Sequence, residues 1–227
     1  MSEFKVNTIT NRDGSYGPQI CGITTFGSSG MQLPSGPTEM RGGRGRGVFG
    51  GGYNPTFTTT LNFVEIATTG NAQDFGDLSL SRKFIASSGD STRGLFMGGE
   101  TPTQKSVIDY VTISSAGGAN DFGDLSQARL GLGAGSSPTR AVFGGGSESP
   151  LNNLLLIDFI EIETGGTAVK FGELSVGRHY VSGISNSTRA LFAGGVTPTT
   201  VNTIDYITIA TQGNATNFGD MTVAARG

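Results

Sequence analysis

The sequence is poor in the residues that build disulfides, metal sites and membrane spans. It has one cysteine, Cys21, and one histidine, His179, in 227 residues. A single cysteine excludes an internal disulfide, and a single histidine excludes a histidine-rich metal site. No apolar run approaches the roughly 20 residues of a membrane-spanning helix. We therefore expect Cys21 to be a buried thiol and expect no membrane span.

The sequence also lacks tryptophan, strong charge and any familiar catalytic motif. Its net charge of -3 gives no global attraction to nucleic acid or to an anionic membrane. Residues 1–5 lack the basic and apolar stretches of a signal peptide. No Gly-x-Ser-x-Gly elbow, Walker loop, His-Glu-x-x-His or Cys-x-x-Cys is present. We expect no enzyme activity, no catalytic residue, no cofactor and no metal.

Glycine is abundant, with 38 residues, and it recurs at fixed places. A short stretch that begins with arginine, contains a phenylalanine and ends in Gly-Gly occurs four times. Its copies are residues 46–52, 93–99, 140–146 and 189–195. The steps between their arginines are 47, 47 and 49 residues. A fixed period in this range indicates one supersecondary unit that is copied along the chain.

Each repeat predicts short strands and no helix. An apolar strand follows each Gly-Gly loop, at 61–66, 108–113, 157–162 and 204–209. Its apolar residues occupy the first, third, fourth and sixth places, which predicts a bulge or burial on both faces between the third and fourth. An arginine (Arg82, Arg129 or Arg178) then precedes a strand that forms an antiparallel hairpin with the next arginine strand. The sequence therefore predicts an all-β chain.

Charged residues also recur with the repeat. The acids Asp77, Asp124, Glu173 and Asp220 accompany the arginines Arg46, Arg93, Arg140 and Arg189. One interpretation is a ring of charges around a central channel that binds an ion or a sugar. The other is a set of internal ion pairs, one in each repeat, of the bidentate kind that suits buried sites. We favour the internal pairs, because a ligand site needs a feature that differs between repeats.

Four short strands per repeat, with Gly-Gly ending one of them, resemble the kelch repeat. Kelch repeats usually have tryptophan where this chain has Phe75, Phe122, Phe171 and Phe218. The resemblance covers 46–227 and implies a β-propeller of about four blades, from repeats 46–92, 93–139, 140–188 and 189–227. The first repeat lacks the strand that precedes Arg93, so we expect an incomplete first blade. We expect the C-terminal tail, residues 20–26 or a neighbouring chain to supply that strand, and deletion of residues 1–30 to lower the melting temperature.

Residues 1–40 stand outside the repeat. They predict short strands at 6–10, 19–26 and 31–33, which is too little apolar surface for an independent core. Residues 41–45 are a Gly/Arg-rich linker; we favour a linker over an RNA contact, because the three arginines of 41–47 are not interleaved with aromatic residues.

The segments 5–14 and 30–36 resemble the leader of bacteriophage tail-fibre and virion proteins, and with the repeats they are similar to structural proteins of cyanobacterial phages (cyanophages). This resemblance implies a virion component on the tail or capsid surface, made in the host cytoplasm, whose leader anchors or oligomerises it, for example as a trimer. Its partners would be other virion proteins and a host-surface glycan or protein. Two alternatives are a cellular kelch-like protein-interaction module and a propeller lectin or enzyme.

Recognition is expected where the repeats differ, in the loops after Gly-Gly, because loops on a rigid scaffold carry binding residues. The candidate interaction residues are Tyr53, Asn54, Phe57, Glu100, Gln104, Lys105, Glu148, Asn152, Asn153 and Thr199. The pair His179-Tyr180, which replaces Lys83-Phe84 and Leu130-Gly131 of other repeats, is expected at the edge of the core.

Overall fold

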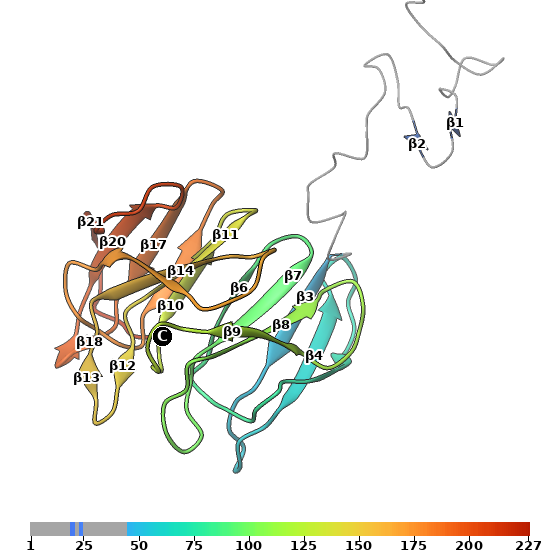
Figure 1. The fold of residues 1–227 in the computed structure, drawn as a ribbon, viewed down its shortest axis with the longest axis horizontal. Coiled ribbons are helices and arrows are strands. Elements are labelled where there is room, and N and C mark those ends of the chain that lie inside the picture. Colours follow the sequence, from blue (N-terminus) through green and yellow to red (C-terminus); the bar gives the residue numbers. More distant parts are fainter. Residues whose placement is uncertain (1–18, 21–22, 25–44) are drawn as a thin grey trace, which may run out of the picture.

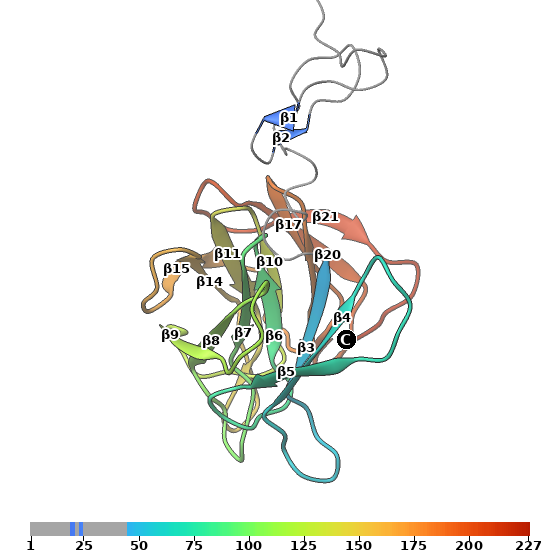
Figure 2. The same cartoon turned by 90° about the vertical axis from the view of Figure 1, so that its right-hand side faces the viewer.

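The computed structural model describes residues 19–20, 23–24 and 45–227, which form strands, turns and loops without a helix. The all-β prediction is therefore confirmed for this part of the chain. Four larger antiparallel sheets follow one another in sequence order from residue 46 onward, and we number them sheet 1 to sheet 4 (Figures 1 and 2).

Sheet 1 has three strands and the other sheets have four. Sheet 1 consists of β3 (Arg46–Gly50), β4 (Thr60–Glu65) and β5 (Gln73–Asp77). Sheet 2 consists of β6 (Ala86–Gly89), β7 (Arg93–Met97), β8 (Val107–Thr112) and β9 (Asn120–Asp124). Sheet 3 consists of β10 (Gly133–Ser136), β11 (Arg140–Gly144), β14 (Leu156–Glu161) and β15 (Val169–Glu173). Sheet 4 consists of β16 (Ser182–Ser185), β17 (Arg189–Ala193), β20 (Thr203–Thr208) and β21 (Thr216–Asp220).

Three short hairpins complete the described strands. Two of them pair β12 (Ser147–Glu148) with β13 (Asn152–Asn153), and β18 (Val196–Thr197) with β19 (Thr199–Thr200). The third pairs β1 (Gln19–Ile20) with β2 (Ile23–Thr24). The single strand expected over 19–26 is therefore wrong, because its first half pairs back on its second half. The strands predicted at 6–10 and 31–33, Cys21, and the linker except residue 45 lie outside the described residues.

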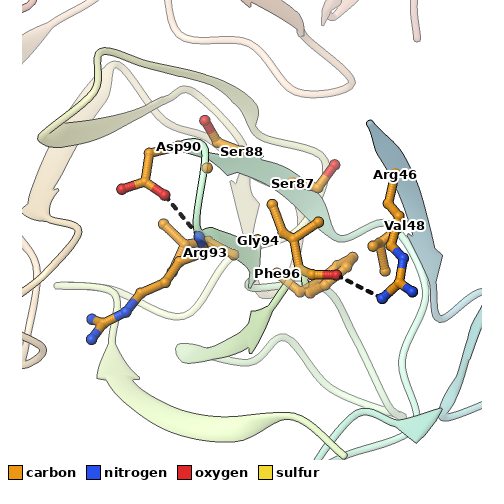
Figure 3. A pocket seen from close by; sticks show the side chains of 11 residues that line it. Arg46, Val48, Ser87, Ser88, Asp90, Arg93, Gly94 and Phe96 are labelled. Atoms are coloured by element: carbon orange, nitrogen blue, oxygen red, sulfur yellow. Dashed lines mark hydrogen bonds between the residues drawn. The ribbon is translucent and has the colours of Figure 1, made fainter. Parts of the chain in front are cut away.

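The three predicted hairpins are present, as β6–β7, β10–β11 and β16–β17. Sheet 1 has no such first strand, and among the described strands β3 pairs only with β4. An open pocket lies beside β3, between Arg46 and Val48 on one side and Ser87, Ser88 and Phe96 of sheet 2 on the other (Figure 3). The described part of residues 20–26 does not supply the missing strand, because β1 and β2 pair with each other.

The sequence predicts either a bulge or burial on both faces within the third strand, and the bulge alternative is wrong, because the bulge lies on the last strand. In sheet 1, Leu61 pairs with Gly76 and Asn62 pairs with Asp74, so the extra residue is Phe75 on the last strand. Sheets 2, 3 and 4 shift register at the equivalent place. Gly76 follows at φ 142°, a conformation that favours glycine. In sheets 2 and 3 the two adjacent apolar residues are explained by burial on both faces, since Val111 packs toward sheet 1 and Tyr110 toward sheet 3, and Ile160 and Phe159 pack on opposite neighbours in the same way.

The core lies between adjacent sheets. One cluster joins Leu61 and Phe75 of sheet 1 to Phe96 and Val111 of sheet 2. Equivalent clusters join sheet 2 to sheet 3 and sheet 3 to sheet 4. The repeat therefore buries its apolar surface by stacking on its neighbours.

A buried arginine holds each connection between sheets. Arg82, Arg129 and Arg178 are fully buried and pair with Asp109, Asp158 and Asp205 at 2.8–3.0 Å. Arg82 also donates to the backbone carbonyls of Phe96 and Val107, and Ser79 Oγ donates to Asp109 at 2.6 Å. Burial lowers the pKa of Arg129 to about 10, with the charge of Asp158 opposing that shift, so the guanidinium stays charged at neutral pH.

These pairs differ from the ones expected from the sequence. The repeated arginines at the strand starts do not pair with the acids of the Phe-Gly segments; Arg46 pairs with Glu65, Arg93 with Glu163 and Arg140 with Glu161. The acids instead accept from nearby side chains, such as Thr59 Oγ1 to Asp77 and Ser106 Oγ to Asp124, both at 2.7 Å. The reason is geometric, since the acids lie at strand ends on the surface while each arginine stacks over a ring of its own sheet.

Breaking one buried pair tests its structural role. We expect Arg129→Met to lower the free energy of unfolding by about 3–5 kcal/mol, because Asp158 is left buried without its counter-charge. The double variant Arg129→Met/Asp158→Leu should lose less than Arg129→Met alone. Lys170→Ala, which removes an exposed pair with Glu173, serves as the control and should cost under about 1 kcal/mol. Urea denaturation measures all three, and equal losses for the single and double variants would contradict this account.

Candidate binding surface

Four loops leave the same position in each sheet, between the second and third strands of the four-strand unit, and they gather along the lower edge in Figure 1. They are residues 51–59, 98–106, 145–155 and 194–202. All ten predicted interaction residues lie in these loops. We call this side of the molecule the loop edge.

The first loop is aromatic. Tyr53 is 60% exposed and bridges to Phe57, with the two rings edge to face at 5.6 Å. Asn54 is exposed at the tip, where its backbone N–H donates to Thr56 O at 2.9 Å. This loop therefore presents a ring that its own turn holds in place.

The second loop is charged and polar. Glu100 bridges to Gln104 in the loop, and its carboxylate accepts from Lys83 Nζ at 3.0 Å. Lys105 donates from Nζ to Thr103 Oγ1 at 3.3 Å and from its backbone N–H to Gly99 O. Glu100 thus links this loop to Lys83, which lies in the segment before β6.

The third and fourth loops contact each other. In the third, the carboxylate of Glu148 accepts from Gln127 Nε2 and, at 2.8 Å, from Asn152 Nδ2. Asn153 donates from Nδ2 to Val196 O of the fourth loop at 3.2 Å. Thr199 is exposed in the β18–β19 hairpin. The structure therefore joins Asn153 to the fourth loop but leaves Thr199 at its outer tip.

A lysine connects the first two loops. Lys83 Nζ lies over the rings of Tyr53, Phe57 and Phe84, at 5.3, 5.5 and 4.8 Å from their centroids. It also pairs with Glu100, so its charge is held on two sides. Cation–π contacts of this length contribute roughly 0.5–1 kcal/mol each at exposed sites. Lys83 therefore fixes the positions of three rings that come from two segments, the loop 51–59 and the residue after Lys83 itself.

Two aromatic residues next to this group have an unusual backbone. Phe84 has φ 56° and Tyr180 has φ 53°, and their rings meet edge to face at 5.2 Å. The equivalent residue in sheet 3 is Gly131, at φ 63°. A left-handed conformation is costly for a large side chain, and such strain concentrates at functional sites. Two repeats thus carry a ring where the backbone favours glycine.

His179 lies beside Tyr180, with ring centroids 4.5 Å apart. Its Nδ1 is 2.6 Å from Asn153 Oδ1, so the imidazole N–H on Nδ1 donates to that oxygen. Burial, together with the nearby charge of Arg226, lowers the pKa of His179 below 6.5. The ring is therefore neutral at pH 7.

We call these side chains the aromatic surface: Tyr53, Phe57, Lys83, Phe84, His179 and Tyr180. Only Tyr53 and Phe57 are among the ten predicted interaction residues. The sequence offered one signal for the others, since His179-Tyr180 and Lys83-Phe84 replace a Leu-Gly pair. His179 and Tyr180 are half-buried, as expected at the edge of the core, whereas Phe84 is 41% exposed. Rings with a polar rim can stack on flat apolar faces while neighbouring polar groups select orientation.

Another pocket lies at the edge opposite the loop edge. The turns of the three hairpins line it, at residues 89–91, 136–138 and 185–187. The Asp90 and Asn186 side chains that line it form hydrogen bonds within their own turns. Asp90 Oδ1 accepts from the backbone N–H groups of Thr92 and Arg93, both at 2.7 Å. Asn186 Oδ1 accepts in the same way from Thr188 and Arg189. We therefore assign this pocket to turn structure.

Within 45–227, no group of three or more His, Cys, Asp or Glu side chains is placed to hold a metal ion. The described residues also contain no helix that is long and apolar enough to span a bilayer. No protein-family model and no curated protein matches the chain.

The strained backbone at Phe84 predicts an inverted preference between alanine and glycine. We expect Phe84→Gly to be more stable than Phe84→Ala by about 1 kcal/mol, because only glycine adopts φ 56° without a steric cost. At the exposed strand residue Ser87, the matched pair Ser87→Gly and Ser87→Ala should show the opposite order. Thermal denaturation decides, and a Phe84→Ala variant at least as stable as Phe84→Gly would refute the strain.

The lowered pKa of His179 predicts a loss of stability at mildly acidic pH. The unfolded chain binds a proton near pH 6.5 that the folded chain resists, so this contribution is complete above pH 6.5 and declines as the pH falls toward the lower folded pKa. We expect the melting temperature to fall more between pH 7.5 and 5 for the natural chain than for His179→Gln. Equal slopes for the two proteins would argue against the assignment.

Proposed function

We propose that this chain is a non-enzymatic, kelch-like β-propeller protein of a phage virion that binds a host-surface glycan through its loop edge. Sheets 1 to 4 would be the blades, with sheet 1 as the incomplete first blade. The repeat pattern and the phage-type leader segments are the sequence support for this proposal. The structural support is a repeated scaffold whose variable loops all lie on one edge.

The observation that carries the glycan proposal is the aromatic surface. Tyr53 and Phe84 expose rings whose positions Lys83 fixes. A sugar ring offers an apolar C–H face that stacks on such rings. Its hydroxyl groups would meet Glu100 and Asn153, which lie at the rim and can accept hydrogen bonds. The strain at Phe84 also has a rationale in this function, because it places the ring beside Tyr180.

A rigid surface suits a protein that must bind without reorganisation. The rings lie in segments that are held by backbone bridges. Two of these bridges join Lys83 to Glu100 and His179 to Val196. Preorganised side chains lose less entropy on binding. Many weak copies on one particle would then add through multivalency.

Binding to host cells tests the aromatic surface. Fluorescently labelled protein should bind host cells in a saturable way, and enzymatic removal of surface glycans should abolish the binding. The variant Tyr53→Ala/Phe84→Gly should bind at least about tenfold more weakly, which corresponds to about 1.4 kcal/mol. Val169→Ala, which shortens an exposed side chain on β15 away from the loop edge, should bind like the natural chain.

Mass spectrometry of purified particles tests the location. The proposal requires this chain in washed virions of the phage that encodes it. Its absence from particles, together with capture of one intracellular protein by the loop edge, would instead establish a cellular kelch-like interaction module. Unchanged cell binding in the Tyr53→Ala/Phe84→Gly variant would refute the recognition surface.

A further inference from the structure

The contact between adjacent sheets is built the same way three times. From the later sheet, two backbone N–H groups donate to carbonyls of the earlier sheet. At the first junction these are Gly117 N to Phe75 O and Ala119 N to Asp77 O, both at 2.7 Å. An arginine of the earlier sheet returns a bond, from Arg46 Nη1 to Ile113 O at 3.2 Å.

The other two junctions repeat every bond. From sheet 3 to sheet 2 the donors and acceptors are Gly166 N to Phe122 O, Ala168 N to Asp124 O and Arg93 Nη1 to Ile162 O, at 2.7–2.8 Å. Between sheets 4 and 3 they are Gly213 N to Phe171 O, Ala215 N to Glu173 O and Arg140 Nη1 to Ile209 O, at 2.8–3.1 Å. We call the side that accepts from the next sheet the trailing face, and the side that donates to the previous sheet the leading face.

Among the residues that the structure describes, two faces have no partner: the trailing face of sheet 4 and the leading face of sheet 1. On sheet 4, Phe218 is 53% exposed, whereas its equivalents Phe75, Phe122 and Phe171 are at most 6% exposed. On sheet 1, Phe49 is 61% exposed, whereas its equivalents Phe96, Phe143 and Phe192 are at most 3% exposed. These residues are therefore interface residues that lack an interface.

The end faces also carry the other residues that form the internal junctions. Gly70 and Ala72 of sheet 1 occupy the donor positions, and Ile66 beside them is 71% exposed while Ile162 and Ile209 are buried. On sheet 4, exposed Arg189 occupies the place of Arg46 and donates no hydrogen bond from its guanidinium among the described residues.

The glycine that allows close contact is present on the free face too. A Cβ added at Gly76, Gly123 or Gly172 would overlap the backbone of Gly117, Gly166 or Gly213 of the next sheet. The equivalent Gly219 has no atom within 4 Å of such a Cβ. Sheet 4 is thus shaped for a neighbouring backbone that is not in place.

We infer that the trailing face of sheet 4 binds the leading face of sheet 1 of a second copy of this chain, in a head-to-tail contact. In that contact Phe218 O accepts from Gly70 N, Asp220 O accepts from Ala72 N, and Arg189 donates to Ile66 O. Phe218 and Phe49 become buried as their equivalents are. The two faces differ, so the contact is heterologous and builds a ring or a longer assembly of copies.

A second copy fits better than closure within one chain. Sheets 1 and 4 lie at opposite ends of the row in Figure 1, and no hydrogen bond among the described residues joins them. Direct backbone contact at Gly76, Gly123 and Gly172 fixes the step from one sheet to the next. The row therefore cannot bend to bring its ends together without breaking a formed junction.

The residues of the buried ion pair are replaced at both end sheets, the aspartate by Asn62 and the arginine by Ala225, so the proposed contact buries no unpaired charge there. Asn62 occupies in sheet 1 the place of Asp109, opposite Phe49 as Asp109 is opposite Phe96. The carbonyl of Ala225 accepts from Gly195 N at 2.9 Å, as the carbonyl of Arg82 accepts from Gly52 N. Within 45–227 no arginine pairs with Asn62 as Arg82 pairs with Asp109, so an aspartate at this position would lack a partner there, and the neutral Asn62 avoids that cost.

Sedimentation velocity on the full chain tests the inference. We expect the natural chain to self-associate at concentrations up to about 100 µM, where a micromolar Kd leaves mostly complex. Phe49→Asp and Phe218→Asp should each weaken association at least about 30-fold, the lower limit for an interface hot spot. Leu151→Asp, at the exposed tip of the β12–β13 hairpin, should associate like the natural chain.

Mixing the two variants gives the decisive result. Each keeps one intact end face, so an equimolar mixture of Phe49→Asp and Phe218→Asp should form a 1:1 dimer and nothing larger. Circular dichroism confirms that both are folded, and the milder Phe49→Ser and Phe218→Ser replace them if either is not. A mixture that stays monomeric overturns the inference, as does association that survives in both single variants, which would place the contact outside the end faces. A monomeric natural chain that either substitution destabilises would show closure within one chain and also overturns it.

This inference does not depend on the proposed function. If monomers of Phe49→Asp still bind host cells, the aromatic surface works without assembly, and the two proposals are tested separately.

Discussion

The buried arginine in each connection between sheets is the interaction on which the rest of the structure depends. The backbone of Arg82 accepts a hydrogen bond from Gly52 in the loop of sheet 1, while its side chain reaches Asp109 and two carbonyls in sheet 2. One residue thus ties the loop of one sheet to the strands of the next. Arg129 and Arg178 do the same for the following pairs of sheets. A chain with 35% apolar residues gains specificity here from a polar network inside an apolar stack.

The buried arginine also positions the aromatic surface. Lys83 and Phe84 directly follow Arg82, and His179 and Tyr180 directly follow Arg178. The strained φ values of Phe84 and Tyr180 are maintained because the preceding arginine is held on several sides. Scaffold and candidate site are therefore adjacent in the chain, and loss of a buried arginine would disturb both. The aromatic surface and the end faces consist of separate residues, so binding at one does not compete with contact at the other.

The repetition of the sheets explains why the two ends matter. A unit that buries its apolar face only against its neighbours leaves one unsatisfied face at each end of the row. Ends of this kind are either capped by polar residues or used for association. Phe49 and Phe218 are neither polar nor buried. The end faces keep the residues of the internal junctions, which makes them complementary to each other.

The sequence by itself determined the repeat, the all-β character, the three hairpins and the loops where the repeats differ, because these follow from local spacing and from glycine at turns. In the last repeat Arg226 follows one residue after the equivalent of Arg82, and the structure shows the carbonyl of Ala225 in the place of the Arg82 carbonyl. Only the tertiary structure decided which arginines are buried, since arginine recurs at the positions of both Arg46 and Arg82 and its partner depends on which side chain points inward. Only the tertiary structure placed the bulge at Phe75, because register is a property of two strands. It alone brought Tyr53, Phe84 and Tyr180 to one surface, since Phe84 and Tyr180 lie far apart in the sequence and meet only through the stacking of sheets.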